Sequence, residues 1–415
     1  MVEMSICAVV LDELMIDILS RLPAKSLCRF KCVAKSWFAL ISSPHFAKTH
    51  LNRSNNNKCE RLILFSGCSL YSVDCTEASY NDCVTATEID FPKIEDPHYF
   101  KEILASCNGL LLVCEEEDTK FLLNPSTRES KKVPDYDFGV DPSTWSCMYG
   151  LGYDSSMDDY KVVAVFYYED EESYCIDTFV VVHSLKTSSW TRIQDFPYDI
   201  SLAMPSSGVF VNGSIHWLTH RSSDHSLVIA AFDVAEETFR DVLPPSSLEE
   251  DEITSGGGLG LLGGCLMCHV WGGAKQADIW VMKEYGVTES WTKYTIYIPN
   301  NMYPFFPMCV SDKEVLLKME GDKEMGEDVF VIYNAKERRL RCITVDGIPP
   351  GSVVSPYYQS AVTYVESIVS PYFHCGIDRK ELSTMTDASL AHNRLLMPPL
   401  DQLILTDEEK KVLIL

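Results

Sequence analysis

A phrase of about fifty residues that recurs along the chain constrains its fold more than any other feature. Each copy has an apolar strand, a polar residue, a short polar turn and a second strand that opens with an aromatic or apolar residue. The copies begin at Phe121, Phe179, Val228, Asp278 and Val329. Their landmark residues, which are Asn124, Ser184, Asp233, Lys283 and Asn334, follow one another at 60, 49, 50 and 51 residues. Self-similarity at this period is typical of repeat architectures.

A second hairpin precedes each phrase, so each repeat contains four strands. Three of these hairpins turn at Asn108-Gly109, Asn212-Gly213 and Gly263-Gly264, dipeptides that tolerate the positive φ of a tight turn. Five four-stranded units of this length favour a β-propeller, whose blades bury their faces against one another. A pair of β-sandwiches is the alternative, and it fits the constant period less well.

The two ends of the repeat region supply further strands. Strand-like segments begin at Arg61 and Ser69, before the first unit, and at Ser360, after the last one. An open stack would expose its end blades, so we expect the ring to close through a sixth blade built from both ends of the chain. The predicted fold class is therefore α+β: a short N-terminal region of three helices, followed by an all-β, propeller-like domain.

The charge of the chain limits the partners it can have. The 415 residues carry a formal net charge of −25. Such a body would repel phosphate groups, which argues against a nucleic acid as its partner. An acidic surface instead favours a basic partner or serves solubility alone.

Cysteine usage and hydropathy indicate a cytoplasmic or nuclear protein. The 16 cysteines are scattered, and the first residues lack the basic segment of a secretory signal, so we interpret the cysteines as reduced thiols. The stretch from Ile253 to Ala274 has no charged residue, but it contains eight glycines and His269. This composition is poor for a helix that spans a membrane, so no membrane partner is predicted.

Two motif matches in that stretch do not fit their structural context. Residues Gly258–Gly263, "GLGLLG", match the dinucleotide fingerprint, but the segment expected to follow is a strand and not a helix. Residues Cys265–His269, "CLMCH", match a c-type haem attachment site, but strand alternation separates Cys268 from the other two. The sequence predicts no catalytic residue, no metal and no cofactor. The alternative is a propeller enzyme whose acids or histidines converge in the central channel.

The N-terminal segment differs from the acidic body, because Arg21 to His50 contains Lys and Arg but no Asp or Glu. Apolar residues recur there at helical spacing, first at Leu11, Leu14, Ile18 and Leu22 and then from Leu27 to Ile41. Pro23 ends the first helix, and Ser26 is a candidate cap for the next one. Three short helices cannot enclose this much apolar surface, so part of it is expected to face another protein or the side of the propeller.

Both the N-terminal segment and the body resemble parts of one known protein family. Residues Leu11 to Leu51 resemble an F-box, through "ILSRLP", "KSL", "RFKCV", "KSW" and "LISSPHF". The body is similar to the F-box-associated interaction domain, through "SCNGLLLV", "LLNPSTRESKKVP", "GLGYDSSMDDYKVV", "NGSIHWL" and "YVESIVSP" in that order. The resemblance implies an F-box over residues 10–52, a kelch-like β-propeller domain over 60–372 and an unassigned tail over 373–415.

The resemblance also implies a function and a contact surface. Members of the family are non-catalytic substrate receptors of SCF-type (cullin-RING) ubiquitin ligases: the F-box binds the Skp-family adaptor, and through it a cullin, while the propeller captures the protein to be ubiquitinated. By position, the adaptor-binding residues are Leu11, Leu14, Ile18, Leu22, Pro23, Leu27, Cys32, Val33 and Trp37. Leu11 stands where relatives usually have Pro, which could weaken the contact or shift the helix start. An adaptor-bound scaffold that acts without degradation is the alternative.

The acidic runs suggest where a substrate binds. If the strands of each unit are named A to D, the runs fall in the B–C and D–A connections, which share one face of the ring. The candidate substrate-binding residues are Glu115, Glu116, Glu117, Asp118, Glu169, Asp170, Glu171, Glu172, Glu249, Glu250, Asp251 and Glu252. The C–D turns on the other face hold Lys and Arg instead. This acidic rim predicts a basic protein substrate, although solvated loops are often acidic without a binding role.

Overall fold

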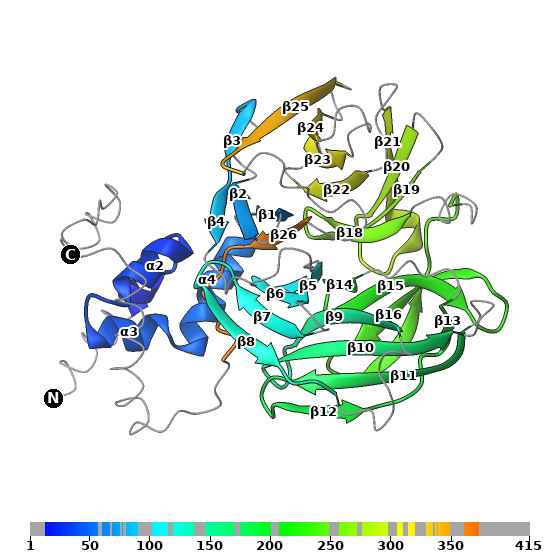
Figure 1. The fold of residues 1–415 in the computed structure, drawn as a ribbon, viewed down its shortest axis with the longest axis horizontal. Helices are drawn as coiled ribbons and strands as arrows, with labels where there is room; N and C mark the ends of the chain where they lie inside the picture. The colour runs from blue at the N-terminus through cyan, green and yellow to red at the C-terminus, as the bar shows by residue number, and fades with distance from the viewer. Residues whose placement is uncertain are drawn as a thin grey trace.

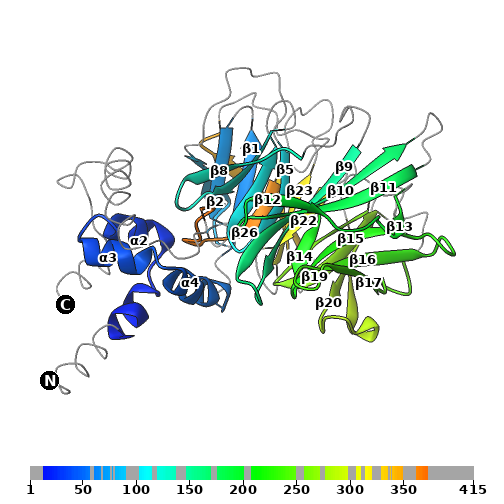
Figure 2. The ribbon, with the colours of Figure 1, turned by 90° about the horizontal axis from the view of Figure 1, so that it is seen from below.

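The computed structural model describes the helical head and most strands of the body. The described residues are 13–56, 60–66, 69–74, 77, 80–89, 102–114, 119–136, 146–169, 175–200, 207–248, 257–271, 276–297, 305–309, 314–319, 329–334, 337, 339–348 and 361–372. The tail assigned to 373–415 and the candidate residue Leu11 lie outside them. Figures 1 and 2 show a small group of helices on one side of a larger body built from strands.

Six sheets form the body, and each is one blade of a β-propeller. The first complete blade along the chain contains β5 (Glu102–Cys107), β6 (Leu110–Cys114), β7 (Lys120–Asn124) and β8 (Glu129–Val133). The next contains β9 (Ser146–Asp154), β10 (Asp159–Glu169), β11 (Cys175–Ser184) and β12 (Ser189–Arg192). The third contains β13 (Tyr198–Asp199), β14 (Val209–Val211), β15 (Ser214–Arg221), β16 (Leu227–Asp233) and β17 (Thr238–Val242).

Of the remaining blades, one is continuous in sequence and two combine strands from both ends of the repeat region. One contains β18 (Gly258–Leu262), β19 (Cys265–Trp271), β20 (Gln276–Met282), the short 3-10 helix η3 (Thr288–Ser290) and β21 (Trp291–Tyr297). The next contains β22 (Phe305–Cys309), β23 (Glu314–Met319), β24 (Val329–Asn334), β25 (Arg339–Asp346) and β3 (Cys83–Thr85). The last is the sheet β26 (Ala361–Val365), β1 (Glu60–Ser66), β2 (Ser69–Asp74) and β4 (Thr87–Ile89).

The ring closes as the sequence predicts, through a blade built from both ends of the repeat region. Strand β26 pairs antiparallel with β1, from Glu60 opposite Val365 to Leu64 opposite Ala361. The innermost strands contact one another in the cycle β5, β9, β14, β18, β22, β26 and back to β5. Their labels gather near the centre of the ring in Figure 1. The propeller prediction is therefore confirmed.

A second closure was not predicted. Strand β3, from the N-terminal side of the ring, pairs in parallel with β25 from the C-terminal side, with Thr344 opposite Cys83. The Arg341 guanidinium donates to an Asp82 carboxylate oxygen at 2.8 Å beside this pair. The two ends of the propeller are thus joined through two neighbouring blades.

The three predicted hairpin turns have the positive φ angles that Asn-Gly and Gly-Gly pairs tolerate. Both central residues have positive φ at Asn108-Gly109 (52° and 84°), Asn212-Gly213 (51° and 79°) and Gly263-Gly264 (59° and 76°). Two consecutive positive φ values are the signature of the type I′ turn, which matches the twist of the strands it joins. The Asn-Gly and Gly-Gly signals in the sequence therefore located these hairpins correctly.

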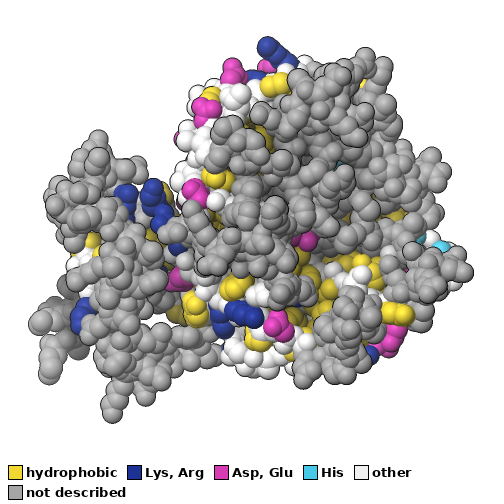
Figure 3. Space-filling model, in the orientation of Figure 1, with side chains coloured by type: hydrophobic (Ala, Val, Ile, Leu, Met, Phe, Trp, Pro, Cys, Tyr) yellow, Lys and Arg dark blue, Asp and Glu magenta, His cyan; other side chains and the backbone are white. Residues whose placement is uncertain are grey.

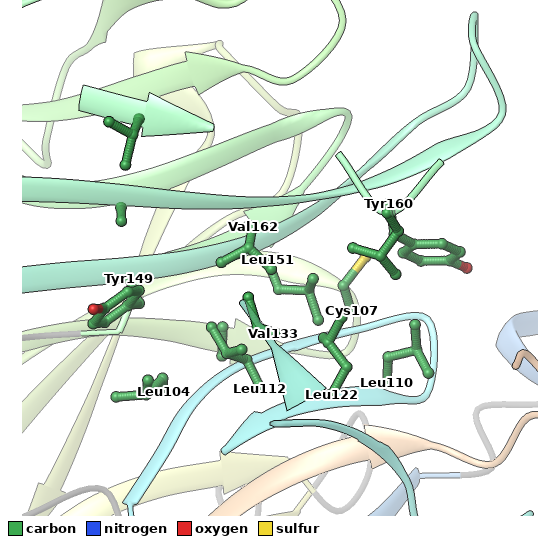
Figure 4. Close-up of a cluster of buried hydrophobic side chains, with 14 of the residues drawn as sticks. Leu104, Cys107, Leu110, Leu112, Leu122, Val133, Tyr149, Leu151, Tyr160 and Val162 are labelled. Atoms are coloured by element: carbon green, nitrogen blue, oxygen red, sulfur yellow. The ribbon is translucent and has the colours of Figure 1, made fainter. Parts of the chain in front are cut away.

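The core lies between neighbouring blades. Side chains of β5–β8 meet those of β9–β11 in one buried cluster, shown in Figure 4, where Leu112 and Leu122 lie opposite Leu151 and Val162. A similar cluster joins the second and third blades around the buried Trp217. Strands such as β6 and β16 are buried on both faces, which explains why their sequences do not alternate cleanly.

The two motif matches lie in a β-hairpin. Residues Gly258–Leu262 form β18, and the turn Gly263-Gly264 leads into β19, which contains Cys265, Cys268 and His269. Cys268 packs in one interblade core and Cys265 against another, as strand alternation requires. A strand and not a helix follows the glycines, which is the context that the sequence predicted.

The described part of the head has four helical segments, one more than the sequence predicted. Residues 13–19 are helical, and α2 (Ala24–Phe30), α3 (Lys35–Ile41) and α4 (Pro44–Asn56) follow. Pro23 is the N-cap of α2, so the cap predicted at Ser26 is wrong: Ser26 lies inside α2 and is buried. A proline fits that position because it lacks the amide hydrogen that a first turn leaves unpaired.

Among the described helices, none combines the length and apolar character that a membrane span needs.

Candidate functional site

The helical head has its own small core. Leu19, Leu27, Phe30, Ile41 and Phe46 are almost completely buried in it. The ring of Trp37 packs edge-on against Phe30, with their centroids 5.3 Å apart. Asp17 lies in the first helical segment and links it to α4. Its carboxylate accepts hydrogen bonds from Arg21, which follows that segment, and from Arg53 of α4. These bonds, led by the one from Arg53, lower the pKa of Asp17.

The predicted adaptor-binding residues divide between the surface and this core. Leu14 and Val33 are the exposed large apolar side chains in the described part of the head, at 54% and 48% exposed. Pro23 is also exposed, and Ile18, Cys32 and Trp37 are half-buried. Leu22 and Leu27 are buried at 7% and 0% exposed, so the structure uses them to fold the head.

Helix α4 is the part of the head that packs on the propeller, and it contributes side chains to the cores of both. Phe46 and Ala47 pack in the head core, whereas Leu51 belongs to the core shared by the first two complete blades. His50 lies at the edge of the head core, where its Nε2 is 3.0 Å from the Leu22 carbonyl oxygen. Burial lowers the pKa of His50, so its neutral form is favoured.

An ion pair seats α4 on the propeller. The Nζ of Lys48 lies 2.7 Å from an Asp158 carboxylate oxygen in the β9–β10 turn, and Tyr153 donates to the same carboxylate at 2.6 Å. Partial burial lowers the pKa of Lys48, but its hydrogen bonds to Asp158 and Tyr153 outweigh burial and raise the pKa overall. Lys48 therefore stays charged at the contact.

The exposed part of the head points away from the propeller. Helices α2 and α3 lie on the far side of α4 in both ribbon views (Figures 1 and 2). In Figure 3, Lys and Arg side chains are visible on the head, and Asp and Glu side chains lie along the adjoining edge of the propeller. The head thus contacts the propeller through α4 and leaves Leu14 and Val33 accessible.

Comparison with known proteins identifies both parts. Residues 12–49 match the model of the F-box domain, and residues 61–371 match that of the F-box associated beta propeller domain. The chain belongs to the F-box-associated propeller family. It is 32% identical over 361 residues to "F-box protein CPR1" of Arabidopsis thaliana, covering 80% of this chain and 84% of that protein. It is 31% identical to "F-box/kelch-repeat protein At3g23880" of the same organism, covering 86% and 95%.

The acidic rim of this F-box protein falls outside the described residues. The runs at 115–118, 170–172 and 249–252 are not described, and Glu169 is the last residue of β10, whose side chain is likewise not described. Strand bounds place the runs in the connections β6–β7, β10–β11 and β17–β18. The head contacts the turns β7–β8 and β9–β10, at the opposite ends of those strands. A substrate site on the acidic rim stays a prediction.

Several histidines are buried in the propeller of this F-box protein. Burial lowers the pKa of His183, His216 and His269 to about 4 in each case, and the three lie in different strands. His216 is held by the Tyr285 hydroxyl at 2.7 Å and by the Val209 carbonyl at 3.0 Å. Within the described ranges, no three His, Cys, Asp or Glu side chains gather as metal ligands would.

Sequence reasoning missed the residues that seat the head. Lys48 lies within the F-box match and Leu51 just after it, but Asp158 and the blade residues that share a buried cluster with Leu51 are more than fifty residues away along the chain. Asn124 stood out only as a turn landmark, although its amide group has a further role. Periodicity identifies an apolar face but does not identify its partner, which explains why this contact surface was not predicted.

Proposed function

We propose that this F-box protein is the substrate receptor of an SCF-type (cullin-RING) ubiquitin ligase. Its head, residues 10–52, binds the Skp-family adaptor and through it a cullin, and its propeller, residues 60–372, captures the protein to be ubiquitinated. The observation that carries the proposal is the pair Leu14 and Val33, large apolar side chains left exposed on a head that is otherwise packed and seated. Exposed apolar groups of this kind mark protein contacts.

The chemistry of ubiquitin transfer belongs to other subunits in this proposal. The chain contributes two binding surfaces at opposite ends of the propeller strands: the head at the turns β7–β8 and β9–β10, and the acidic rim at the other ends. The rim attracts a basic substrate and speeds its association, an effect that weakens as salt rises. The described cysteines are free thiols, which suits the cytoplasm or the nucleus.

The structure changes which head residues best test adaptor binding. Replacing the buried Leu22 or Leu27 would remove core packing, so lost binding would not distinguish contact from unfolding. Leu14→Ser and Val33→Ser alter exposed side chains and should have little effect on folding. Because anchors in a contact centre contribute about 2 kcal/mol or more each, we expect each single variant to bind purified adaptor about thirtyfold more weakly. The double variant should bind several hundredfold more weakly.

Leu243→Ser is the matched control, since Leu243 is 52% exposed but lies after β17 on the propeller. It should bind the adaptor as the unmodified chain does. Binding is measured by calorimetry with the full chain, and circular dichroism checks that all three proteins are folded. Undiminished adaptor binding by the Leu14→Ser, Val33→Ser chain would refute the assigned surface, and failure of the unmodified chain to bind any Skp-family adaptor would refute the function.

A further inference from the structure

The segment that follows the last strand, Glu366–Tyr372, lies between the head and the propeller. We call this segment the strap. It leaves the innermost strand β26 and crosses one end of the blade β5–β8. Its hydrogen-bond partners follow that path outward: Ser367 donates to the Asn108 carbonyl in the β5–β6 turn at 2.9 Å, and the Tyr372 hydroxyl donates to the Ser130 carbonyl in β8 at 2.6 Å.

One side of the strap is held by Asn124 at the end of β7. This side chain is completely buried, and its amide nitrogen donates to the carbonyl of Ser367 at 3.1 Å and to that of Val369 at 2.7 Å. Its carbonyl oxygen accepts from the backbone amides of Ser126 and Thr127, at 2.8 and 3.3 Å. One amide group thus organises the β7–β8 turn and fastens the strap to it.

The other side of the strap completes the head. Ile368 is 3% exposed and belongs to the same buried cluster as Leu19, Leu27 and Phe30. Cys28 of α2 lies over the same turn, with its sulfur 3.9 Å from the Ser126 carbonyl oxygen. The core of the head therefore includes a side chain from the C-terminal end of the propeller.

We propose that the strap locks the head onto the propeller, so that the F-box and the capture domain form one unit with a fixed orientation. The strap acts with the Lys48–Asp158 ion pair and with Leu51, which hold the adjacent helix. In a ubiquitin ligase this lock fixes the direction from the adaptor to the captured protein, a consequence that rests on the proposed function. The lock itself does not depend on that function.

Asn124→Asp tests the lock, because it replaces only the side-chain amide nitrogen, which donates to the strap, with an oxygen. The equivalent turn in the third blade already uses Asp233, whose carboxylate accepts from the amides of Ala235 and Glu236, both at 3.0 Å. An Asp at position 124 can therefore organise the turn, but it cannot donate to the two strap carbonyls and places an oxygen against them. Asp233→Asn makes the reverse change at a turn remote from the strap and is the matched control.

Two measurements on the full chain report the state of the lock. Hydrogen exchange followed by mass spectrometry should show at least about tenfold faster exchange in the strap, α2 and α4 of Asn124→Asp, with β15 and β16 unchanged. A carbodiimide should join Lys48 to Asp158 without a spacer in the unmodified chain, because the two groups form an ion pair. The yield of this cross-link should fall severalfold in Asn124→Asp, relative to the cross-link between Lys161 and Glu237 within the propeller.

Ile368→Ala provides a second variant if Asn124→Asp fails to fold, because it removes the head contact and leaves the turn intact. Faster exchange in α2 together with a weaker Lys48–Asp158 cross-link, in either folded variant and absent from Asp233→Asn, supports the lock. Unchanged α2 exchange and cross-link yield in every variant that folds would overturn it, since the head would then be held without the strap. Adaptor affinity is measured separately, so failure of the proposed function would leave this result standing.

Discussion

A chain that ends at Ser360 is expected to lose cooperative unfolding and to aggregate, whereas a chain that ends at Tyr372 should unfold like the full chain. The shorter chain lacks β26, which occupies the innermost position of the closing blade and pairs with β1 along five residues, from Glu60 opposite Val365 to Leu64 opposite Ala361. Without it, β1 presents an unpaired edge and β5 loses a neighbour. The buried residues Tyr364, Ile368 and Val369 are lost as well.

Size-exclusion chromatography and thermal melts followed by circular dichroism compare these lengths. A chain ending at Val365 separates two effects, because it keeps β26 and lacks the strap. We expect its propeller to close and its head to loosen. If the chain ending at Ser360 stayed monomeric with an unchanged melt, closure would rest on the β3–β25 pair and the role assigned to β26 would be wrong.

The propeller was predictable because its signals are local. An Asn-Gly pair between apolar segments specifies a tight turn from four residues of sequence, and the structure has the required positive φ at Asn108 and Gly109. The fifty-residue spacing then counts the blades. The composite blade joins distant residues, and it was predictable for a different reason: closing the ring leaves the unpaired strands at its two ends only one another to pair with.

The contacts between parts were not predictable, because they join residues far apart in the sequence. Nothing near Cys83 indicates that its strand pairs in parallel with one around Thr344. The helical spacing of Leu14, Leu22 and Leu27 does not reveal that the first is exposed and the other two buried. The resemblance to the F-box implies that all three are adaptor contacts, and this assignment stays a prediction.

A substitution at Gly109 should be far more harmful than the same substitution at Gly213. Both glycines occupy the second central position of an Asn-Gly turn, with φ of 84° and 79°. A Cβ at Gly109 would lie 2.2 Å from the Ser367 hydroxyl oxygen and 2.6 Å from the Val365 carbonyl oxygen, while a Cβ at Gly213 would meet nothing within 4 Å. The backbone strain is therefore the same at both sites, and only Gly109 adds a clash with the strap and the closing strand.

Urea unfolding of Gly109→Ala and Gly213→Ala measures this difference directly. We expect Gly213→Ala to lower the free energy of unfolding by about 1–2 kcal/mol, the cost of a left-handed alanine. Gly109→Ala should lower it by about 2–5 kcal/mol, because overpacking against backbone adds about 1–3 kcal/mol to the same strain. Rotation of the Ser367 hydroxyl leaves the Ser367 Cβ at 2.7 Å, and the Val365 carbonyl belongs to β26 and can move only if the closing blade shifts. Equal losses at the two glycines would mean that β26 and the strap yield at little cost, which contradicts a tightly closed ring.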